Sequence, residues 1–146
     1  MTDEELRARA SVVLEARSWL GTPYHSHGRI KGVGVDCAML PAEVYNRVGL
    51  IPAISPKYAK QLYMHHGEEL YVEWVEKFAR EIDRAQALPG DMVLWKFGKT
   101  FSHGAIIVEL PEVIHSALAS RSVVLGNIDQ DSDLVGRPAR FFSFWG

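Results

Sequence analysis

The pattern of apolar residues changes at Pro89-Gly90, and this change constrains the fold more than any other feature of the chain. Before it, apolar residues recur at helical spacing. After it, the chain divides into short runs of β-branched and aromatic residues, each about as long as a strand. The runs are DMVLWKF, HGAIIVEL, EVIHSAL, SVVLG and ARFFSFW. Helices followed by strands indicate an α+β fold, in which the helices pack against an antiparallel sheet of about five strands.

Three helical regions are expected ahead of this change. The motif T-x-x-E that begins at Thr2 is a capping box, and apolar residues then recur at helical spacing as far as Gly21. Those apolar residues are Leu6, Ala10, Val13 and Leu20. A second helix is expected over residues 37–47, and a third helical stretch over residues 55–84 with a break at Gly67.

Composition narrows the class of protein. The chain has 146 residues, of which 47% are hydrophobic and 23% charged, as in a globular domain with a substantial core. A net charge of −2 argues against nucleic acid as a partner. No apolar run approaches the roughly 18 residues of a membrane span, and MTDEELRARA is too charged for a signal peptide. We therefore expect synthesis in the cytoplasm without an export signal, and delivery to any outside site of action by other means.

The only cysteine, Cys37, lies in the stretch GVGVDCAML, after a glycine-rich loop and at the start of the second expected helix. If Asp36 caps that helix, Cys37 falls in its first turn, where unpaired N–H groups and the helix dipole favour a thiolate. Two interpretations stay open on this segment alone. Cys37 is either a nucleophile or a small buried hydrophobic residue, and Asp36 is explained by capping in both cases.

Two histidines in apolar strands favour the first interpretation. His103 begins one expected strand, and His115 lies on the next, twelve residues later. If the hairpin loop centres on Leu110, His115 stands opposite Ala105, which faces the same side as His103. The two imidazoles are then diagonal neighbours with Cβ atoms on the order of 7 Å apart. A register slip of one residue would separate them. A base oriented by a second polar residue is what a cysteine nucleophile requires.

The segments GTPYHSHGRIKGVGVDCAML and PGDMVLWKFGKTFSHGAIIVELPEVIHSA closely resemble the NlpC-type family of cell-wall cysteine peptidases. The resemblance runs from Trp19 to about Leu118 and combines five motifs in order: G-T-P-Y, D-C, P-G-D, S-H-G and I-H. It implies a compact papain-like fold and a single peptidase domain over residues 1–146. RIKGVGVDC is most similar to the stand-alone members encoded in phage tail operons and prophages, which implies phage tail proteins as partners.

The resemblance also implies roles for the matching residues. Cys37 is the nucleophile, His103 the general base and acid, and His115 the residue that orients His103. Tyr24 of G-T-P-Y corresponds to a tyrosine beside the cysteine, which with the Cys37 N–H stabilises the oxyanion. The implied reaction is hydrolysis of peptidoglycan stem peptides through a thioester, commonly between D-glutamate and a diamino acid. No metal or organic cofactor is implied.

Two positions depart from the family's pattern. Its helix usually reads D-C-S-G-L, whereas this chain has DCAML, and Met39 is expected to crowd the site or alter a substrate subsite. Pro41 is tolerable if the helix begins at or after Cys37. Neither change removes a reacting group. The thiol pKa is therefore still expected to lie well below its ordinary value of about 8.5.

Other polar residues allow more than one interpretation. His25 and His27 form an H-S-H pair that could bind zinc with Cys37 or His103, but no carboxylate or second thiol pattern supports such a site. They fit better as residues that line the cleft or face solvent. The candidates for contact with substrate are Asp36, His25, His27 and Ser102.

Three more features concern the scaffold. His65-His66 are expected at the surface of a helix, and Asp91 is expected to open a strand through a turn contact. Several aromatic residues are expected in the core or at an interface, namely Trp74, Phe78, Phe141, Phe142, Phe144 and Trp145. The C-terminal stretch FFSFWG alternatively packs against a partner protein.

Three functions of different classes remain open. The first is a peptidoglycan peptidase, and the second is acyl transfer by the same residues, because an amine can replace water in attacking a thioester. The third is a phage tail assembly or structural component with a vestigial site. The presence of Cys37, His103 and His115 argues against the third. The oligomeric state stays undetermined.

Overall fold

The structure, a computed structural model, describes residues 1–64 and 69–146, so the predicted surface pair His65-His66 and the predicted break at Gly67 lie outside the described residues. The helices are α1 (Asp3–Arg17), α2 (Met39–Arg47), α3 (Pro56–Met64) and α4 (Leu70–Glu76), with a short 3-10 helix at Arg84–Gln86. The strands are β1 (Arg29–Ile30), β2 (Gly34–Val35), β3 (Arg80–Ile82), β4 (Met92–Phe97), β5 (Thr100–Glu109), β6 (Glu112–Ala117), β7 (Ser122–Asn127) and β8 (Ala139–Ser143). Within these described ranges, no helix is long and apolar enough to cross a bilayer.

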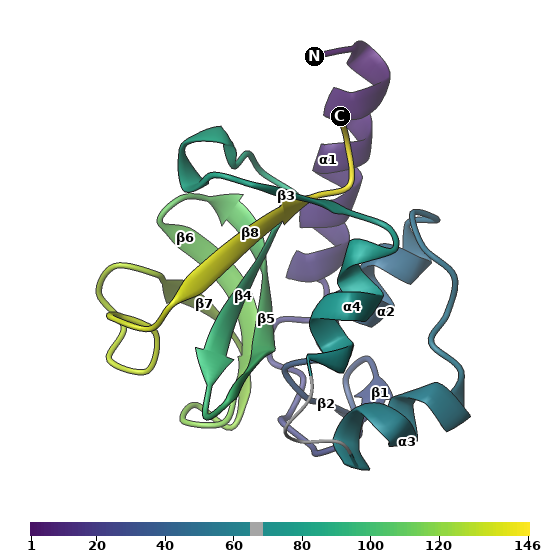
Figure 1. Ribbon diagram of the computed structural model, residues 1–146, viewed down its shortest axis with the longest axis vertical. Coiled ribbons are helices and arrows are strands. Elements are labelled where there is room, and N and C mark those ends of the chain that lie inside the picture. Colours follow the sequence, from purple (N-terminus) through teal and green to yellow (C-terminus); the bar gives the residue numbers. More distant parts are fainter. Residues whose placement is uncertain (65–68) are drawn as a thin grey trace.

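The strands β3 to β8 form one antiparallel sheet in the order β3-β8-β4-β5-β6-β7. Figure 1 shows the helices gathered against one face of this sheet, with α3 and the β1–β2 hairpin at one end. The predicted papain-like α+β fold, with helices packed against an antiparallel sheet, is confirmed. All five predicted strands are present, as β4 to β8.

A sixth strand, β3, lies where a helix was predicted. The stretch 55–84 contains α3 and α4 as expected, but it ends in Arg80–Ile82, which pairs with β8 at the edge of the sheet. Arg80 and Glu81 are exposed and only Ile82 is buried. A segment of three residues with one buried side chain is too short for its hydrophobic pattern to distinguish a strand from the end of a helix. Its pairing with β8 makes it a strand.

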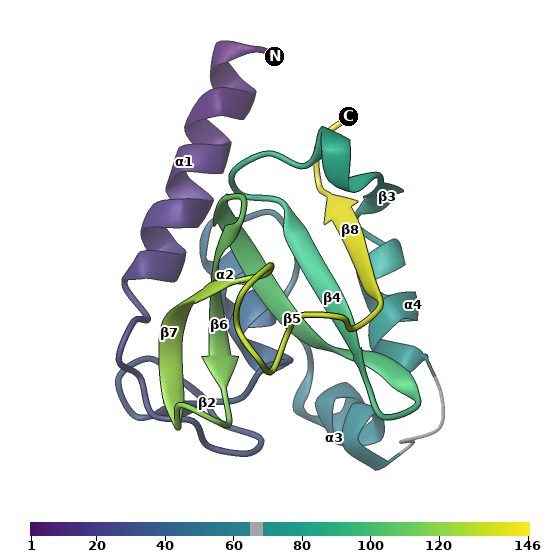
Figure 2. The same cartoon turned by 90° about the vertical axis from the view of Figure 1, so that its left-hand side faces the viewer.

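Alternate residues of the central strands fill cores on both faces of the sheet. On the helix side, Met92, Leu94 and Ile106 pack with buried residues of α1, α2 and α4. On the other face, apolar residues of the strands pack with Ile128 and Leu134. Those two residues belong to the connection between β7 and β8, and Figure 2 shows this connection crossing the face of the sheet that the helices leave uncovered.

Helix α1 forms as predicted but buries a different face. Thr2 caps it by accepting a hydrogen bond from the Glu5 N–H at 3.0 Å. The buried residues of the helix are Arg9, Val12 and Ala16. In contrast, Leu6 is 58% exposed. The apolar spacing therefore identified the helix but not its buried face, which includes an arginine.

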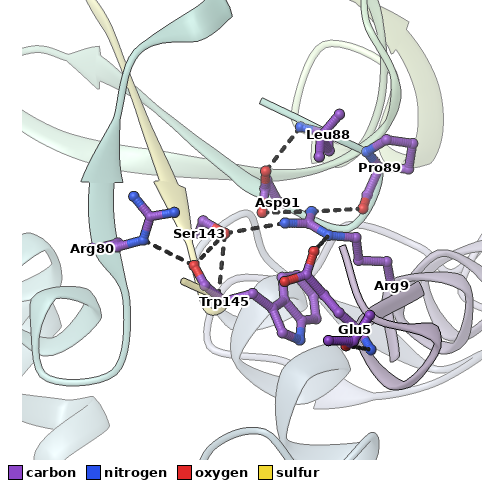
Figure 3. A network of polar contacts seen from close by, with 9 residues as sticks. Glu5, Arg9, Arg80, Leu88, Pro89, Asp91, Ser143 and Trp145 are labelled. Carbon is purple, nitrogen blue, oxygen red and sulfur yellow. Dashed lines mark hydrogen bonds and ion pairs between the residues drawn. The ribbon is translucent and has the colours of Figure 1, made fainter. Parts of the chain in front are cut away.

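Arg9 is buried because a network of acceptors surrounds its guanidinium group (Figure 3). Nη1 donates to Asp91 Oδ1 at 2.9 Å and to the carbonyl oxygen of Pro89 at 3.1 Å, and Nε pairs with Glu5 at 3.2 Å. Asp91 also accepts from the Leu88 N–H at 2.9 Å, which confirms its predicted turn contact. A buried ion pair therefore joins α1 to the start of β4.

The aromatic residues expected in the core are mostly found there. Trp74, Phe141 and Phe142 are buried. Phe144 packs on Tyr45 with ring centroids 4.2 Å apart. The C-terminal stretch therefore contributes to the core of its own chain, and its alternative role in contacting a partner protein stays a prediction.

Candidate active site

Cys37 lies in the turn that begins helix α2, with Asp36 as the cap. Asp36 Oδ1 accepts hydrogen bonds from the N–H groups of Ala38 at 3.2 Å and Met39 at 2.9 Å. The Asp36 carbonyl oxygen accepts the Leu40 N–H at 3.1 Å, the spacing of a first helical turn. The predicted capping is confirmed. It places the Cys37 side chain at the positive end of the helix dipole.

The two departures from the family's motif face different surroundings. Pro41 lies against Gly104 of β5, where an added β-carbon would stand 3.0 Å from the proline ring. Because residue 104 is a glycine, α2 can approach β5 closely at Pro41. Met39 is fully buried and borders the hollow next to the one that contains Cys37, so its effect on a substrate subsite stays a prediction.

Cys37 opens into a cleft of about 620 Å³ between α2, the helices α3 and α4, and the β4–β5 turn. Three predicted residues share this cleft with it, namely Tyr24, Asp36 and Ser102. A neighbouring hollow of about 820 Å³ is lined by His27, Arg29, Met39 and Lys60 among others. Ser26 and Tyr63 line both hollows, so the two adjoin.

The two histidines of the H-S-H pair differ in position. His27 is exposed and faces the larger hollow. His25 is exposed too, but its Nδ1 contacts the carbonyl oxygen of Ser26 at 2.9 Å, and its ring lies beside Gly34. Of the two, His27 is therefore placed to meet a ligand. Among the described residues, no three His, Cys, Asp or Glu side chains gather closely enough to hold a metal ion.

His103 and His115 form a buried pair on β5 and β6. Ile106 pairs with Ile114 in the hairpin, a register that sets His115 beside Ala105 as predicted. His103 Nε2 lies 2.8 Å from His115 Nδ1, and the rings stand edge to face. His103 also stacks on Phe97 with centroids 4.6 Å apart. The predicted neighbourhood of the two imidazoles is confirmed.

A β-bulge at Ser102 joins the cysteine to this pair. Trp95 pairs with His103 but Lys96 pairs with Phe101, so β5 advances by two residues while β4 advances by one. Bulges often re-aim a strand next to a functional site. Here the Cys37 thiol donates to the carbonyl oxygen of Ser102 at 3.9 Å.

The thiol thus lies against the residue that precedes His103. Among the described residues, no hydrogen bond joins Cys37 directly to either imidazole. Phe97, which stacks on His103, lines the same cleft as Cys37. Catalytic hydrogen bonds are commonly long in ligand-free enzymes and shorten when substrate binds.

The electrostatics differ from the expected thiolate–imidazolium pair. Partial desolvation by the surrounding protein, followed by the nearby Asp36 carboxylate, raises the pKa of the Cys37 thiol to about 12. Burial, followed by His115 and Arg137, lowers the pKa of His103 to about 3. The expectation of a thiol pKa below about 8.5 is wrong for this structure, because desolvation outweighs the helix dipole and the hydrogen bond from Tyr24. Both shifts favour a neutral thiol and a neutral imidazole in the resting site.

Two tyrosines belong to the site although no motif marked them. Tyr63 of α3 donates its hydroxyl hydrogen to Asp36 Oδ2, and its ring meets His27 edge to face with centroids 3.8 Å apart. Tyr71 of α4 donates to the carbonyl oxygen of Ala38 at 2.6 Å. Both tyrosines lie in a stretch that the sequence identifies only as helical, so nothing in it indicated their contacts with α2.

Comparison with known proteins agrees with this architecture. The sequence model described as the NlpC/P60 family matches residues 21–132. No curated protein matches the chain by sequence. The solved NlpC/p60 domain of the peptidoglycan hydrolase SagA is 23% identical with a TM-score of 0.65, over 90% of this chain and 96% of that one.

Two structures from Mycobacterium tuberculosis are also similar. The peptidoglycan hydrolase RipB is 20% identical with a TM-score of 0.64, over 99% of this chain and 68% of its own. RipD is described as a non-catalytic NlpC/p60 domain protein adapted to peptidoglycan binding. It is 16% identical with a TM-score of 0.61, and the match covers 94% of this chain and 98% of RipD. At these identities the likeness establishes the fold. The expected likeness to phage-tail members stays a prediction.

Proposed function

Because the chain belongs to the NlpC/P60 family, we propose that it is a cysteine peptidase that hydrolyses an amide bond in the stem peptides of peptidoglycan. The observation that supports this most is the position of Cys37. Its thiol stands at the start of α2, inside a cleft, and against the strand that carries the His103–His115 pair. SagA and RipB, which share the fold, are described as peptidoglycan hydrolases.

The chemistry follows from the neutral resting pair. As Sγ attacks the substrate carbonyl carbon, the thiol proton passes to His103, which becomes an imidazolium oriented by its contact with His115. The imidazolium then returns this proton to the leaving amine, and the C–N bond breaks to leave a thioester. Water then attacks the thioester carbonyl carbon as His103 takes its proton. The C–S bond breaks to release the carboxylic acid product, and His103 returns the proton to Sγ, which restores the thiol. Proton transfer thus accompanies bond formation and does not precede it.

Two donors are available for the developing oxyanion. The Cys37 N–H lies in the first turn of α2, next to the Ala38 and Met39 N–H groups from which Asp36 accepts hydrogen bonds, and the Tyr24 hydroxyl lies beside the sulfur. Burial, followed by the charges of Cys37 and Asp36, raises the pKa of Tyr24, so this hydroxyl keeps its proton and can donate it in a hydrogen bond. Donors fixed in a water-poor cleft stabilise such charge strongly.

The proposed bond joins D-glutamate to the diamino acid of the stem peptide, as the resemblance to the family implies. The site of action is then the bacterial cell wall. Asp36, Ser102 and His27 line the two adjoining hollows and are the proposed substrate contacts. His25 points to its own loop and is the weakest of the predicted contacts.

A second candidate function is peptidoglycan binding without turnover. It is favoured by the protonated thiol and by the lack of a direct hydrogen bond between Cys37 and His103 in the described residues. RipD, with a similar fold, is described as non-catalytic and adapted to peptidoglycan binding. In that case the cleft would hold the stem peptide without cleaving it.

Mass spectrometry of muropeptides separates these functions. Purified peptidoglycan is incubated with the wild-type protein and with Cys37→Ala, and the soluble products are identified. We expect stem-peptide fragments from wild type and none from Cys37→Ala. If both proteins sediment with peptidoglycan and neither releases fragments, the proposed function is binding and not hydrolysis. Fragments joined to an added amine would instead indicate acyl transfer.

A further inference from the structure

A third hollow, of about 390 Å³, reaches His115 from the side of the β7–β8 connection. Its lining includes His115, Val124, Asp131, Ser132 and Asp133. Both carboxylates come from the connection that crosses the uncovered face of the sheet (Figure 2). No step of the proposed reaction uses them.

Gly126 of β7 makes room for this approach. A β-carbon at this position would stand 2.7 Å from His115 Nε2 and 3.1 Å from Asp131 Oδ2. The imidazole nitrogen and the carboxylate oxygen therefore both lie next to the space that a side chain at Gly126 would occupy. Any side chain at position 126 would displace one of them.

The state of His115 determines what His103 can do. The 2.8 Å contact between His103 Nε2 and His115 Nδ1 contains one hydrogen, and each neutral ring carries one N–H. If the hydrogen belongs to His103, His103 Nδ1 is free to act as a base, and His115 carries its own hydrogen on Nε2. If the hydrogen belongs to His115 Nδ1, His103 must carry its hydrogen on Nδ1 and cannot accept a proton there.

We propose that Asp131 and Asp133 are positioning residues that accept the Nε2 hydrogen of His115 through solvent in this hollow, and so keep His103 Nδ1 free as the base. His115 and both carboxylates line the same hollow, so water in it can bridge Nε2 to either carboxylate. The carboxylates favour an N–H donor over a lone pair at Nε2, because a lone pair would repel them. The catalytic consequence rests on the proposed function, whereas the tautomer of His115 does not.

The charges around the pair agree with this assignment. Burial lowers the pKa of His115, and Asp133 and Asp131 oppose that shift. On the other side, the guanidinium carbon of Arg137 lies 3.7 Å from the centroid of the Phe97 ring, which stacks on His103. The β7–β8 connection thus places negative charge beside His115 and positive charge near His103.

Nitrogen NMR of the histidine side chains tests the tautomer directly. Long-range ¹⁵N–¹H spectra of the wild-type protein at pH 7 should show both His103 and His115 with hydrogen on Nε2. The test variant is Asp131→Asn/Asp133→Ala. It removes both charges but keeps an amide oxygen for the Asn127 N–H, which Asp131 holds at 2.8 Å. We expect His115 to shift toward the Nδ1–H form, and kcat to fall by at least about tenfold with KM unchanged.

Asp129→Asn is the matched control, because it removes a charge from the same connection but at a side chain that pairs with Arg84. It should change neither spectrum nor kcat. A His115 signal that keeps Nε2–H in the double variant, or lacks it in the wild type, would overturn the assignment. Asp133→Ala alone repeats the test if the double variant fails to fold. The spectra need no turnover, so a protein without peptidase activity would refute the proposed function and leave this test intact.

Discussion

The hydroxyl group of Tyr63 on α3 donates a hydrogen bond to the carboxylate of Asp36, which caps α2 next to Cys37. This contact joins the two helices that border the cleft. Tyr63→Phe removes the donor and keeps the ring on His27. We expect the free energy of unfolding to fall by about 1–3 kcal/mol, since the lost bond has a charged acceptor. Urea unfolding measures it, and Tyr58→Phe on the same helix is the control. Equal losses for the two variants would show that the Asp36 contact contributes nothing of its own.

The raised thiol pKa makes alkylation of Cys37 strongly dependent on pH. Only the thiolate reacts, and the pKa is about 12, so the rate with iodoacetamide should rise roughly tenfold per pH unit from pH 7 to pH 9. The chain has one cysteine, so mass spectrometry reports this site alone, and Cys37→Ala should take up no label. A rate that is already constant below pH 7 would demonstrate a preformed thiolate–imidazolium pair.

The two buried histidines should make the fold sensitive to acid. Their pKa values in the folded state lie below the ordinary 6.5, so below that pH the unfolded chain binds protons that the folded chain does not. Stability is therefore complete above about pH 6.5 and falls with acidification, by up to about 1.4 kcal/mol per pH unit for each histidine. For His103 the loss continues toward pH 3.

Urea unfolding at several pH values measures this slope. His115→Gln should reduce it, whereas His25→Gln, which replaces an exposed imidazole, should leave it unchanged. The explanation fails if the slopes of all three proteins coincide between pH 6.5 and pH 4.

Substitution of each histidine should separate their roles in turnover. His103→Ala removes the proton acceptor and should lower kcat by on the order of 10²–10⁴. His115→Ala removes only the group that orients it and should have a smaller effect. Initial rates on purified muropeptides, with circular dichroism to verify folding, compare the two. Equal or reversed effects would mean that the two roles are assigned to the wrong residues.

The buried Arg9–Asp91 pair should be essential for stability. Asp91→Asn removes the fully buried charged partner of the guanidinium group and leaves only the more exposed Glu5, and we expect a loss of about 3–5 kcal/mol in the free energy of unfolding. Glu81→Gln breaks the exposed pair with Arg140 and should cost about 1 kcal/mol or less. Thermal or urea denaturation ranks the two. Similar losses would show that burial of the Arg9 pair adds nothing to its contribution.

Local patterns predicted the features that depend on neighbours in sequence. The cap of α1 at Thr2 and the cap of α2 at Asp36 need only a few residues each, and both formed. The hairpin of β5 and β6 is short, so the positions of His103 and His115 followed from a turn and the two-residue period of a strand.

Features that depend on distant partners were missed. The strand β3 exists because β8 pairs with it, and the buried face of α1 includes Arg9 because Asp91, 82 residues away, neutralises it. The thiol pKa was predicted in the wrong direction, because a helix dipole can be inferred from sequence whereas the depth of a sulfur atom cannot. The contacts of Tyr63 and Tyr71 with α2 likewise arise only when the helices pack.

The adjoining hollows that share Ser26 and Tyr63 bear on the design of selective inhibitors. An electrophile that captures the sulfur in the smaller hollow could carry a bulky substituent past Tyr63 into the larger one. There it would meet Tyr63 and the exposed His27, which line that hollow. Such a compound would gain its selectivity from its contacts in the larger hollow, and its potency from the reactive group.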